Sequence, residues 1–268
     1  MATLLCFHAH PDDEASLTAG TMARAADEGH RVVLVVATDG ALGEVPEDLG
    51  PGETLVERRR LESQRSADRL GVARVVWLGY RDSGMTGWEQ NEDSASFLQA
   101  DVEEAAQRLA IVLVEEAADV LTIYDWHGNY GHPDHVQVHR VGVRAAELAG
   151  TPRVFEATMN RDHIRRLWGQ ARDSGAAVGS PGEEDFDPDG PADDGNPFGT
   201  EESALTHAVD VSAFIERKRE AVRCHASQVT DTAFFLQMPT ELFTLAFGTE
   251  WFIERGVPAD LREGWLLD

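Results

Sequence analysis

Apolar and polar positions along the chain alternate between two kinds of segment. Short continuous runs rich in Val, Ile and Leu predict buried strands at residues 2–7, 31–37, 73–78, 120–124 and 153–157. Stretches with helical spacing of apolar positions lie between them, at residues 15–28, 55–70, 100–118 and 135–148. Strands that are apolar on both faces and alternate with helices are typical of a covered parallel sheet. The pattern therefore predicts an α/β fold, with a mostly parallel, Rossmann-like sheet and helices on both faces.

This alternation divides the chain into two parts of one domain. We expect residues 1–160 to form the α/β core and residues 161–268 to complete it as a smaller C-terminal portion, because 268 residues suffice for one large domain. Residues 173–204 break the pattern. Nine acids lie between 183 and 203, and no Lys or Arg occurs between 173 and 216. This composition predicts a surface loop or a locally disordered insertion, with a lid over a pocket as the alternative.

The charge of the chain narrows the classes of partner. A net charge of −25 argues against nucleic acid and anionic membranes, because both would be repelled. No apolar run approaches the 18 residues of a membrane span, and the two cysteines form no CxxC pair. The first strand begins next to Met1, so we expect no signal peptide and a cytoplasmic protein. The sequence leaves the oligomeric state open, and a homo-oligomer is compatible with it.

Two clusters of histidines and acids follow two of the predicted strands. Residues 8–14 read His-Ala-His-Pro-Asp-Asp-Glu, and residues 127–135 read His-Gly-Asn-Tyr-Gly-His-Pro-Asp-His. Open α/β sheets place their sites at the carboxyl ends of their strands, where both clusters would lie. So many buried charges are costly unless a cation or a reaction uses them. The clusters therefore predict one divalent metal site.

The spacing within the clusters suits a hydrolytic metal centre. Zinc hydrolases typically use three protein ligands and keep one position for water, whose pKa falls to about 7. His10 and Asp13 can reach one ion from a tight turn, and His132 or His135 can supply the third ligand. Asp12, beside the ligands but off the metal, fits a general base. Two nitrogens and one carboxylate suit Zn²⁺, although Fe²⁺, Co²⁺ or Ni²⁺ could take the same place.

The two motifs together resemble those of a known family. His10-Pro11-Asp12-Asp13-Glu14 with His132-Pro133-Asp134-His135 is similar to the zinc-dependent de-N-acetylases of N-acetylglucosaminyl-phosphatidylinositol and N-acetylglucosaminyl-inositol. The segments at residues 81–85 and 130–135 resemble the actinobacterial mycothiol-pathway members, namely the inositol-sugar deacetylase and the mycothiol conjugate amidase.

The resemblance implies a role for each matching residue. The metal ligands would be His10, Asp13 and His135, and Asp12 would be the base. His132 would face the developing oxyanion or protonate the leaving amine. The remaining matches would orient His132 (Asp134), polarise the carbonyl (Tyr130) and hold sugar hydroxyls (Arg59, Arg81 and Asp82).

The implied activity is removal of an N-acetyl or related acyl group from an N-acetylglucosamine-type sugar or glycoconjugate. An amidase for mycothiol-type thiol conjugates is an alternative substrate choice with the same chemistry. Leu17 stands where that amidase has a lysine and the deacetylase a small polar residue, which favours a small acyl group. A metal phosphoesterase would need more bridging carboxylates. A non-catalytic sugar-binding protein on the same fold should have lost Asp12, which is present.

Overall fold

Eight strands form one sheet within the part of the chain that the structure describes. The computed structural model describes residues 1–174, 187, 189–228 and 236–268. The strand order across the sheet is β3-β2-β1-β4-β5-β7-β6-β8. The bounds are β1 (Thr3–His8), β2 (Arg31–Thr38), β3 (Arg74–Tyr80), β4 (Val120–Tyr124), β5 (Arg153–Thr158), β6 (His207–Asp210), β7 (Thr249–Glu254) and β8 (Arg262–Glu263).

The sheet is mostly parallel, as the sequence predicts. Strands β1 to β5 pair with one another only in parallel, whereas β7 runs antiparallel to both β5 and β6. The chain order reverses at β1, which lies between β2 and β4. Such a switch point opens a crevice beyond the carboxyl ends of the two central strands, where α/β folds bind ligands. The sheet also continues from the first 160 residues into the C-terminal portion through β6, β7 and β8.

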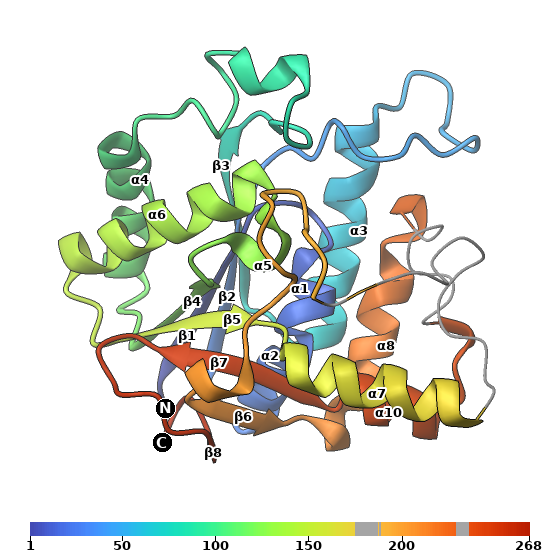
Figure 1. Ribbon diagram of the computed structural model, residues 1–268. Helices are drawn as coiled ribbons and strands as arrows, with labels where there is room; N and C mark the ends of the chain where they lie inside the picture. The colour runs from blue at the N-terminus through green and yellow to red at the C-terminus, as the bar shows by residue number, and fades with distance from the viewer. Residues whose placement is uncertain (175–186, 188, 229–235) are drawn as a thin grey trace.

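Helices cover both faces of the sheet (Figure 1). On one side α4 (Val102–Glu115) packs against α6 (Pro133–Ala149), and on the other α3 (Leu55–Leu70) and α2 (Ala19–Asp27) pack against α8 (Ile215–Cys224). Alternate residues of β1 feed the two cores: Leu5 and Phe7 belong to one, Leu4 and Cys6 to the other. Other helices among the described residues are α1 (Asp13–Leu17), α5 (Gly128–Gly131), α7 (Arg161–Ser174), α10 (Thr240–Phe247) and the short 3₁₀ turns η1 (Glu89–Glu92), η2 (Glu202–Ala204), η3 (Ser212–Phe214) and η4 (Ala226–Gln228).

Two predicted helices differ from those in the structure. The helix expected at 15–28 is divided into α1 and α2 at Thr18, which has non-helical torsion angles. The Thr18 hydroxyl is hydrogen-bonded to His8 Nε2 at 2.8 Å, a tertiary contact that local sequence spacing does not reveal. The helix expected to begin at His135 begins two residues earlier, because Pro133 occupies its first position. His135 therefore lies in the first turn of α6.

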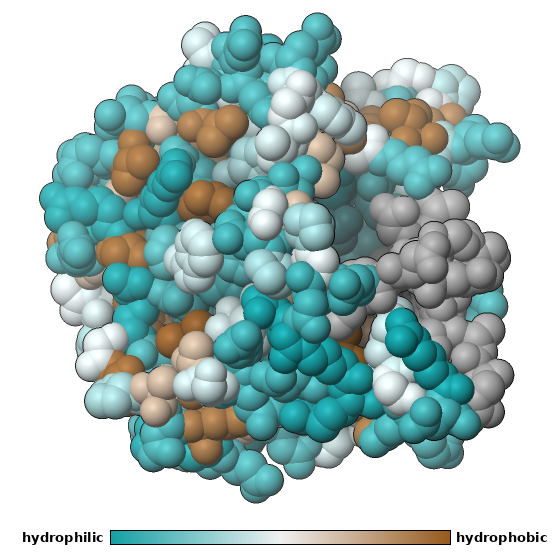
Figure 2. Space-filling view, in the orientation of Figure 1, coloured by the Kyte–Doolittle hydropathy of each residue, from teal (hydrophilic) through white to brown (hydrophobic). Residues whose placement is uncertain are grey.

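Part of the acidic stretch lies outside the described residues, namely 175–186 and 188. Its later portion packs against the second cluster, since the Gly199 N–H donates to Asn129 O and the Asp193 N–H donates to Tyr130 O. The face seen in Figure 2 is mainly hydrophilic, in keeping with the large negative charge. None of the described helices combines the length and apolar composition needed to cross a bilayer.

Candidate active site

The two clusters meet at the carboxyl ends of β1 and β4. These strands are neighbours in the sheet, with Leu4 paired to Val120 and Cys6 to Thr122. The chain leaves β1 and turns directly into α1, and it leaves β4 through α5 into α6. The parallel pairing thus brings residues 10–13 next to residues 132–135, as the sequence predicts.

His10 is held between two carboxylates. Its Nδ1 lies 3.4 Å from Asp13 Oδ2, while its Nε2 donates to Asp134 Oδ2 at 3.1 Å. Burial by itself would lower the pKa of His10, but Asp82, Asp13 and Asp134 outweigh it and raise that pKa well above 6.5. Closely spaced carboxylates of this kind stabilise a positive charge at the site.

His135 uses one ring nitrogen in a hydrogen bond, and its other nitrogen makes none within the part of the chain that the structure describes. Its Nδ1 is hydrogen-bonded to the Gly128 carbonyl oxygen at 3.2 Å. Its Nε2 is buried, has no hydrogen-bond partner among the described residues, and lies 3.4 Å from Asp13 Oδ1. Gly128 has a φ of +67°, and a Cβ added to it would lie only 2.3 Å from the His135 Cβ. A glycine is therefore required for this ring to sit beside Asp13.

These residues fit a divalent metal ion. Two ligand atoms about 2.1 Å from a tetrahedral zinc ion lie about 3.4 Å apart, and both His–Asp13 distances match that spacing. The other nitrogen of each ring contacts a carboxylate or a carbonyl oxygen, which is the usual outer support of a metal-bound imidazole. The orphaned His135 Nε2 also has an acceptor lone pair with no other use.

Other ligand combinations exist at the same place. Within the described residues, two trios have ligand atoms that all lie within 4.8 Å of one another: His10 with His132 and His135, and His10 with Asp82 and Asp134. Asp13 belongs to neither trio, although it contacts both His10 and His135. The ligand set His10, Asp13 and His135 therefore stays a prediction.

Asp12 occupies the position expected of a base beside the metal site. It has a φ of +116°, which is unusual for a residue other than glycine. Strained backbone conformations of this kind cluster at functional sites. The Arg59 guanidinium contacts Asp12 Oδ2 at 3.0 Å and also donates to the carbonyls of Pro11 and Gly40. Burial raises the pKa of Asp12, and Arg59 partly offsets this. A carboxylate with a raised pKa accepts a proton more readily.

A buried network behind Asp12 was not predicted in full. Glu14 Oε1 accepts hydrogen bonds from His225 Nε2 and Ser66 Oγ, both at 2.6 Å, and Glu14 Oε2 accepts from the Asp12 N–H at 3.1 Å. Burial would lower the pKa of His225, but Glu14 raises it. A supporting role for Glu14 could be expected from its place in the motif. The sequence gives little indication that His225 belongs to the site, because it lies 211 positions from Glu14.

Asp134 contacts His132 through its backbone and His10 through its side chain. The Asp134 backbone N–H donates to His132 Nδ1 at 3.1 Å, while the Asp134 carboxylate accepts from His10 Nε2, from the Ser83 backbone N–H at 2.9 Å and from the Ser83 hydroxyl. That Asp134 orients His132 during the reaction stays a prediction. Burial, with His10 and His135 nearby, lowers the pKa of His132 to about 2. A neutral ring that accepts at Nδ1 carries its proton on Nε2.

Tyr130 lines a pocket together with Asp12 and Asp13. Its ring lies edge-on to His135, with centroids 5.0 Å apart, and stacks on Phe198. Burial and the nearby Asp13 raise the pKa of Tyr130, so the phenol keeps its proton and remains a hydrogen-bond donor.

The three expected sugar contacts are placed unequally. Arg59 is buried and uses both terminal nitrogens on Asp12 and backbone carbonyls. Asp82 is buried 3.5 Å from His10 Nε2, and it accepts from the Gly84 and Leu42 amides. Arg81 is exposed and pairs with Asp93 at 3.1 Å. Their contact with a sugar stays a prediction, and the first two have evident roles in positioning the site.

A pocket of about 390 Å³ opens over these groups. Its lining includes Asp12, Asp13, Tyr130, His135, His225 and Gln228. This volume lies within the range of small-molecule sites. A candidate metal site and the Asp12 carboxylate line this pocket, and the neutral His132 imidazole lies beside His135; together they are the parts that hydrolysis of an amide requires.

Comparison with known proteins decides the family. Residues 5–146 match the model of the PIG-L family, described as GlcNAc-PI de-N-acetylase. The chain belongs to this family. Deacetylases of 1D-myo-inositol 2-acetamido-2-deoxy-α-D-glucopyranoside are similar over nearly their full length. The protein from Streptomyces avermitilis is 39% identical (97% of this chain, 96% of the relative), and that from Nocardioides sp. is 35% identical (98% and 95%).

The PIG-L fold is shared with more distant enzymes. The N,N′-diacetylchitobiose deacetylase of Pyrococcus horikoshii superposes with a TM-score of 0.60 at 22% identity, covering 96% of this chain and 84% of that one. This likeness shows the fold. The matched residues 5–146 contain both clusters, whereas Glu14's partner His225 lies beyond them.

Proposed function

We propose that this protein is a metal-dependent amide hydrolase that removes the N-acetyl group from an N-acetylglucosamine-type glycoside. The observation that carries the proposal is the meeting of the two clusters, with Asp13 lying 3.4 Å from both His10 and His135 and Asp12 beside them. Membership of the PIG-L family supports the same activity, since its relatives at 35–39% identity are named as sugar deacetylases.

His10, Asp13 and His135 would hold the ion, with zinc the expected metal and Fe²⁺ a competitor for the same ligands. When bound, the metal lowers the pKa of a water and polarises the acyl carbonyl. Asp134 accepts a hydrogen bond from His10 Nε2, and the Gly128 carbonyl accepts one from His135 Nδ1. These bonds orient both imidazole rings and would leave one nitrogen of each ring for the ion.

Asp12 would take the proton from the attacking water, while Arg59 holds its carboxylate in place. His132 would offer its Nε2 proton to the oxygen that becomes negative as the tetrahedral state forms, because its neutral form is strongly favoured. Tyr130, also protonated, is a second donor for the carbonyl. This assignment favours the oxyanion role of His132 over protonation of the amine.

The substrate would be a small amino-sugar glycoside, and the inositol-linked N-acetylglucosamine of the named relatives is the first compound to test. A thiol-conjugate amidase would use the same groups and remains the alternative. Asp82 and the two arginines, Arg59 and Arg81, would contribute to sugar recognition. We also propose a cytoplasmic location, in which this substrate would be available.

The test combines metal analysis with acetate release. The wild type should contain about one divalent ion per chain and release acetate from N-acetylglucosamine glycosides in preference to simple N-acetyl amines. His135→Ala should lose both the ion and the activity. His139→Ala, four residues on in the same helix, is the matched control and should keep both. A metal-loaded, active His135→Ala protein would contradict the ligand assignment.

A further inference from the structure

A second cavity adjoins the catalytic pocket. It has a volume of about 340 Å³ and shares Ser16, Leu17, Met159 and Phe198 with the wall of the catalytic pocket. The shared residues make the two spaces neighbours. A group attached to a substrate whose amide lies over the proposed metal site would have to pass only these four side chains to enter the second space.

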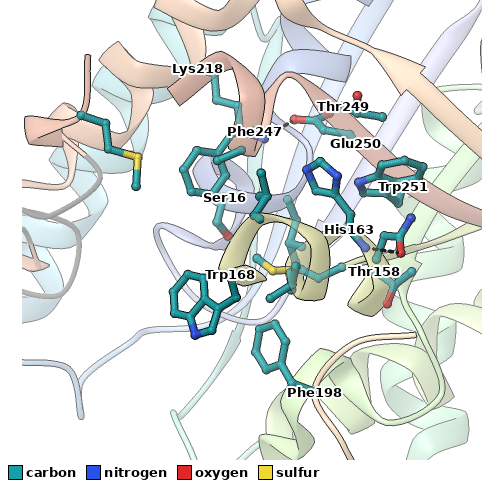
Figure 3. Close-up of a pocket in the computed structure, with 17 residues that line it drawn as sticks. Ser16, Thr158, His163, Trp168, Phe198, Lys218, Phe247, Thr249, Glu250 and Trp251 are labelled. Carbon is teal, nitrogen blue, oxygen red and sulfur yellow. Dashed lines mark hydrogen bonds and ion pairs between the residues drawn. The ribbon is translucent and has the colours of Figure 1, made fainter. Parts of the chain in front are cut away.

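The wall of this cavity is dominated by large apolar side chains. Figure 3 shows Trp168 and Phe198 in the lower part of the view, with Phe247 and Trp251 above them. The other apolar residues are Leu17 from α1 and Met159, Ile164, Leu167, Met238 and Ala246, which α7, α10 and the adjoining segments supply. Several are only half-buried, including Leu167 and Trp168. Burying apolar surface lowers the free energy by about 25 cal/mol per Å², so an apolar ligand group that covers these side chains would gain binding free energy.

Several polar groups in the wall are bound to other parts of the protein. Lys218, the one lysine of the chain, is buried and pairs with Glu250 at 2.7 Å (Figure 3). Glu250 also accepts from the Gly20 and Thr21 amides at the start of α2.

Two further polar side chains are engaged in the same way. The Thr158 hydroxyl donates to Asp125, and the Asn160 side chain contacts Glu202 and the His163 amide. A polyhydroxylated group would exchange its hydrogen bonds to water for a wall in which Lys218, Glu250, Thr158 and Asn160 already have partners, which is unfavourable.

We infer that this cavity is an apolar subsite, and that the natural substrate carries an alkyl or aromatic group in addition to its acetamido sugar. The inference rests on the proposed deacetylase function and narrows its substrate class. Leu17 fits this reading, because it is an apolar side chain at the junction of the two spaces. The apolar group would be attached through the glycosidic oxygen or within the acyl group, and both place a hydrocarbon beside the sugar.

The experiment measures kcat/KM for two series of compounds. One series holds the acetamide constant and lengthens the glycoside from methyl through butyl to hexyl. The other holds the methyl glycoside constant and lengthens the acyl group from acetyl to hexanoyl. A buried methylene is worth up to about fourfold, or 0.8 kcal/mol. We expect at least about a tenfold rise between the ends of one series, and the series that rises identifies the attachment point.

A matched pair of variants tests the location. Leu167→Gln places an amide in the cavity wall and should reduce the ratio of hexyl to methyl kcat/KM toward one. Leu148→Gln makes the same change on the solvent side of α6, where Leu148 is 40% exposed, and should leave that ratio unchanged. Thermal unfolding of both variants checks that they fold.

Binding provides a readout that does not depend on turnover. Trp168 and Trp251 line the cavity, so tryptophan fluorescence of the chelator-treated protein should report hexyl glucoside binding. Its dissociation constant should be at least about tenfold lower than that of methyl glucoside. Flat series together with equal dissociation constants would overturn the inference while leaving deacetylation intact. Absence of acid release from every compound, with tighter hexyl glucoside binding, would instead contradict the proposed function.

Discussion

Glu14 and His225 stand 211 positions apart in the sequence, and their buried side chains meet in a hydrogen bond of 2.6 Å. Glu14 also accepts from the backbone N–H of Asp12. The pair therefore connects α8 and the segment after it to the loop that carries the proposed base. Its ionisation links the stability of the protein to pH.

We predict that His225→Gln destabilises the protein more at pH 6 than at pH 9. The pKa of His225 is raised, so its contribution is complete below its unfolded value of about 6.5 and is lost as pH rises through the higher folded value. The pKa of Glu14 is lowered, so its contribution is lost only as pH falls below about 4.5. Removing one member of a buried pair costs about 3 kcal/mol.

Urea unfolding in the presence of a chelator measures this difference without a contribution from metal binding. Ser66→Ala is the matched control, since it removes another hydrogen bond to Glu14 Oε1 without removing a titrating group. Its cost should be similar at both pH values. Equal losses for His225→Gln at pH 6 and pH 9 would refute the charged pair.

Gly128→Ala should release the metal. The added Cβ would lie 2.3 Å from the His135 Cβ, so the ring must move from its place beside Asp13. Gly150→Ala is a close control, because Gly150 has a φ of +69° against +67° but no atom within 4 Å of its added Cβ. Both variants should pay the left-handed backbone penalty of about 1–2 kcal/mol. Only Gly128→Ala should lose bound metal by elemental analysis.

Asp12→Asn should retain the metal and lose about 10²–10⁴ in kcat, because it removes the proton acceptor and leaves the ligands in place. Asparagine tolerates positive φ, so the loop should fold normally at φ +116°. Asp27→Asn, at the exposed end of α2, should have no effect on turnover. Normal turnover by metal-loaded Asp12→Asn would eliminate Asp12 as the base.

His132→Ala should lower kcat by about 10²–10³ with little change in KM. The lost Nε2 donor would act on charge that exists only in the transition state, where one donor contributes about 3–4 kcal/mol. Steady-state kinetics on a methyl N-acetylglucosaminide separates the two constants. An effect confined to KM would make His132 a residue that positions the substrate.

The sequence predicts the five parallel strands β1 to β5 well because they are locally encoded as apolar runs, whereas β6, β7 and β8 are not among the predicted strands. The run Val120–Tyr124 coincides with β4, and its apolar character on both faces indicates burial on both sides. Each of the two clusters directly follows one such strand, and this position also predicts that the clusters meet at one edge of the sheet. The PIG-L resemblance is confirmed by the comparisons, and it supplied the roles of the individual residues.

Contacts between distant segments could not be predicted in the same way. The break at Thr18 depends on a hydrogen bond to His8 in the neighbouring strand. The Asp134 carboxylate is shared between His10, which is 124 positions earlier in the chain, and Ser83, which is 51 positions earlier. These outcomes follow from packing in three dimensions, for which adjacent sequence carries no information.

The proposed metal ligands and base all precede residue 136, whereas the apolar cavity, apart from Ser16 and Leu17, is built from residue 158 onward. The residues proposed to break the amide bond and those proposed to bind the apolar group of the substrate thus lie in different segments of the chain. Substitutions in α7 or α10 can therefore alter which compounds are accepted without disturbing a single ligand atom. In a lineage carrying this fold, new substrates would arise through changes in the C-terminal portion while the reaction itself is inherited unchanged.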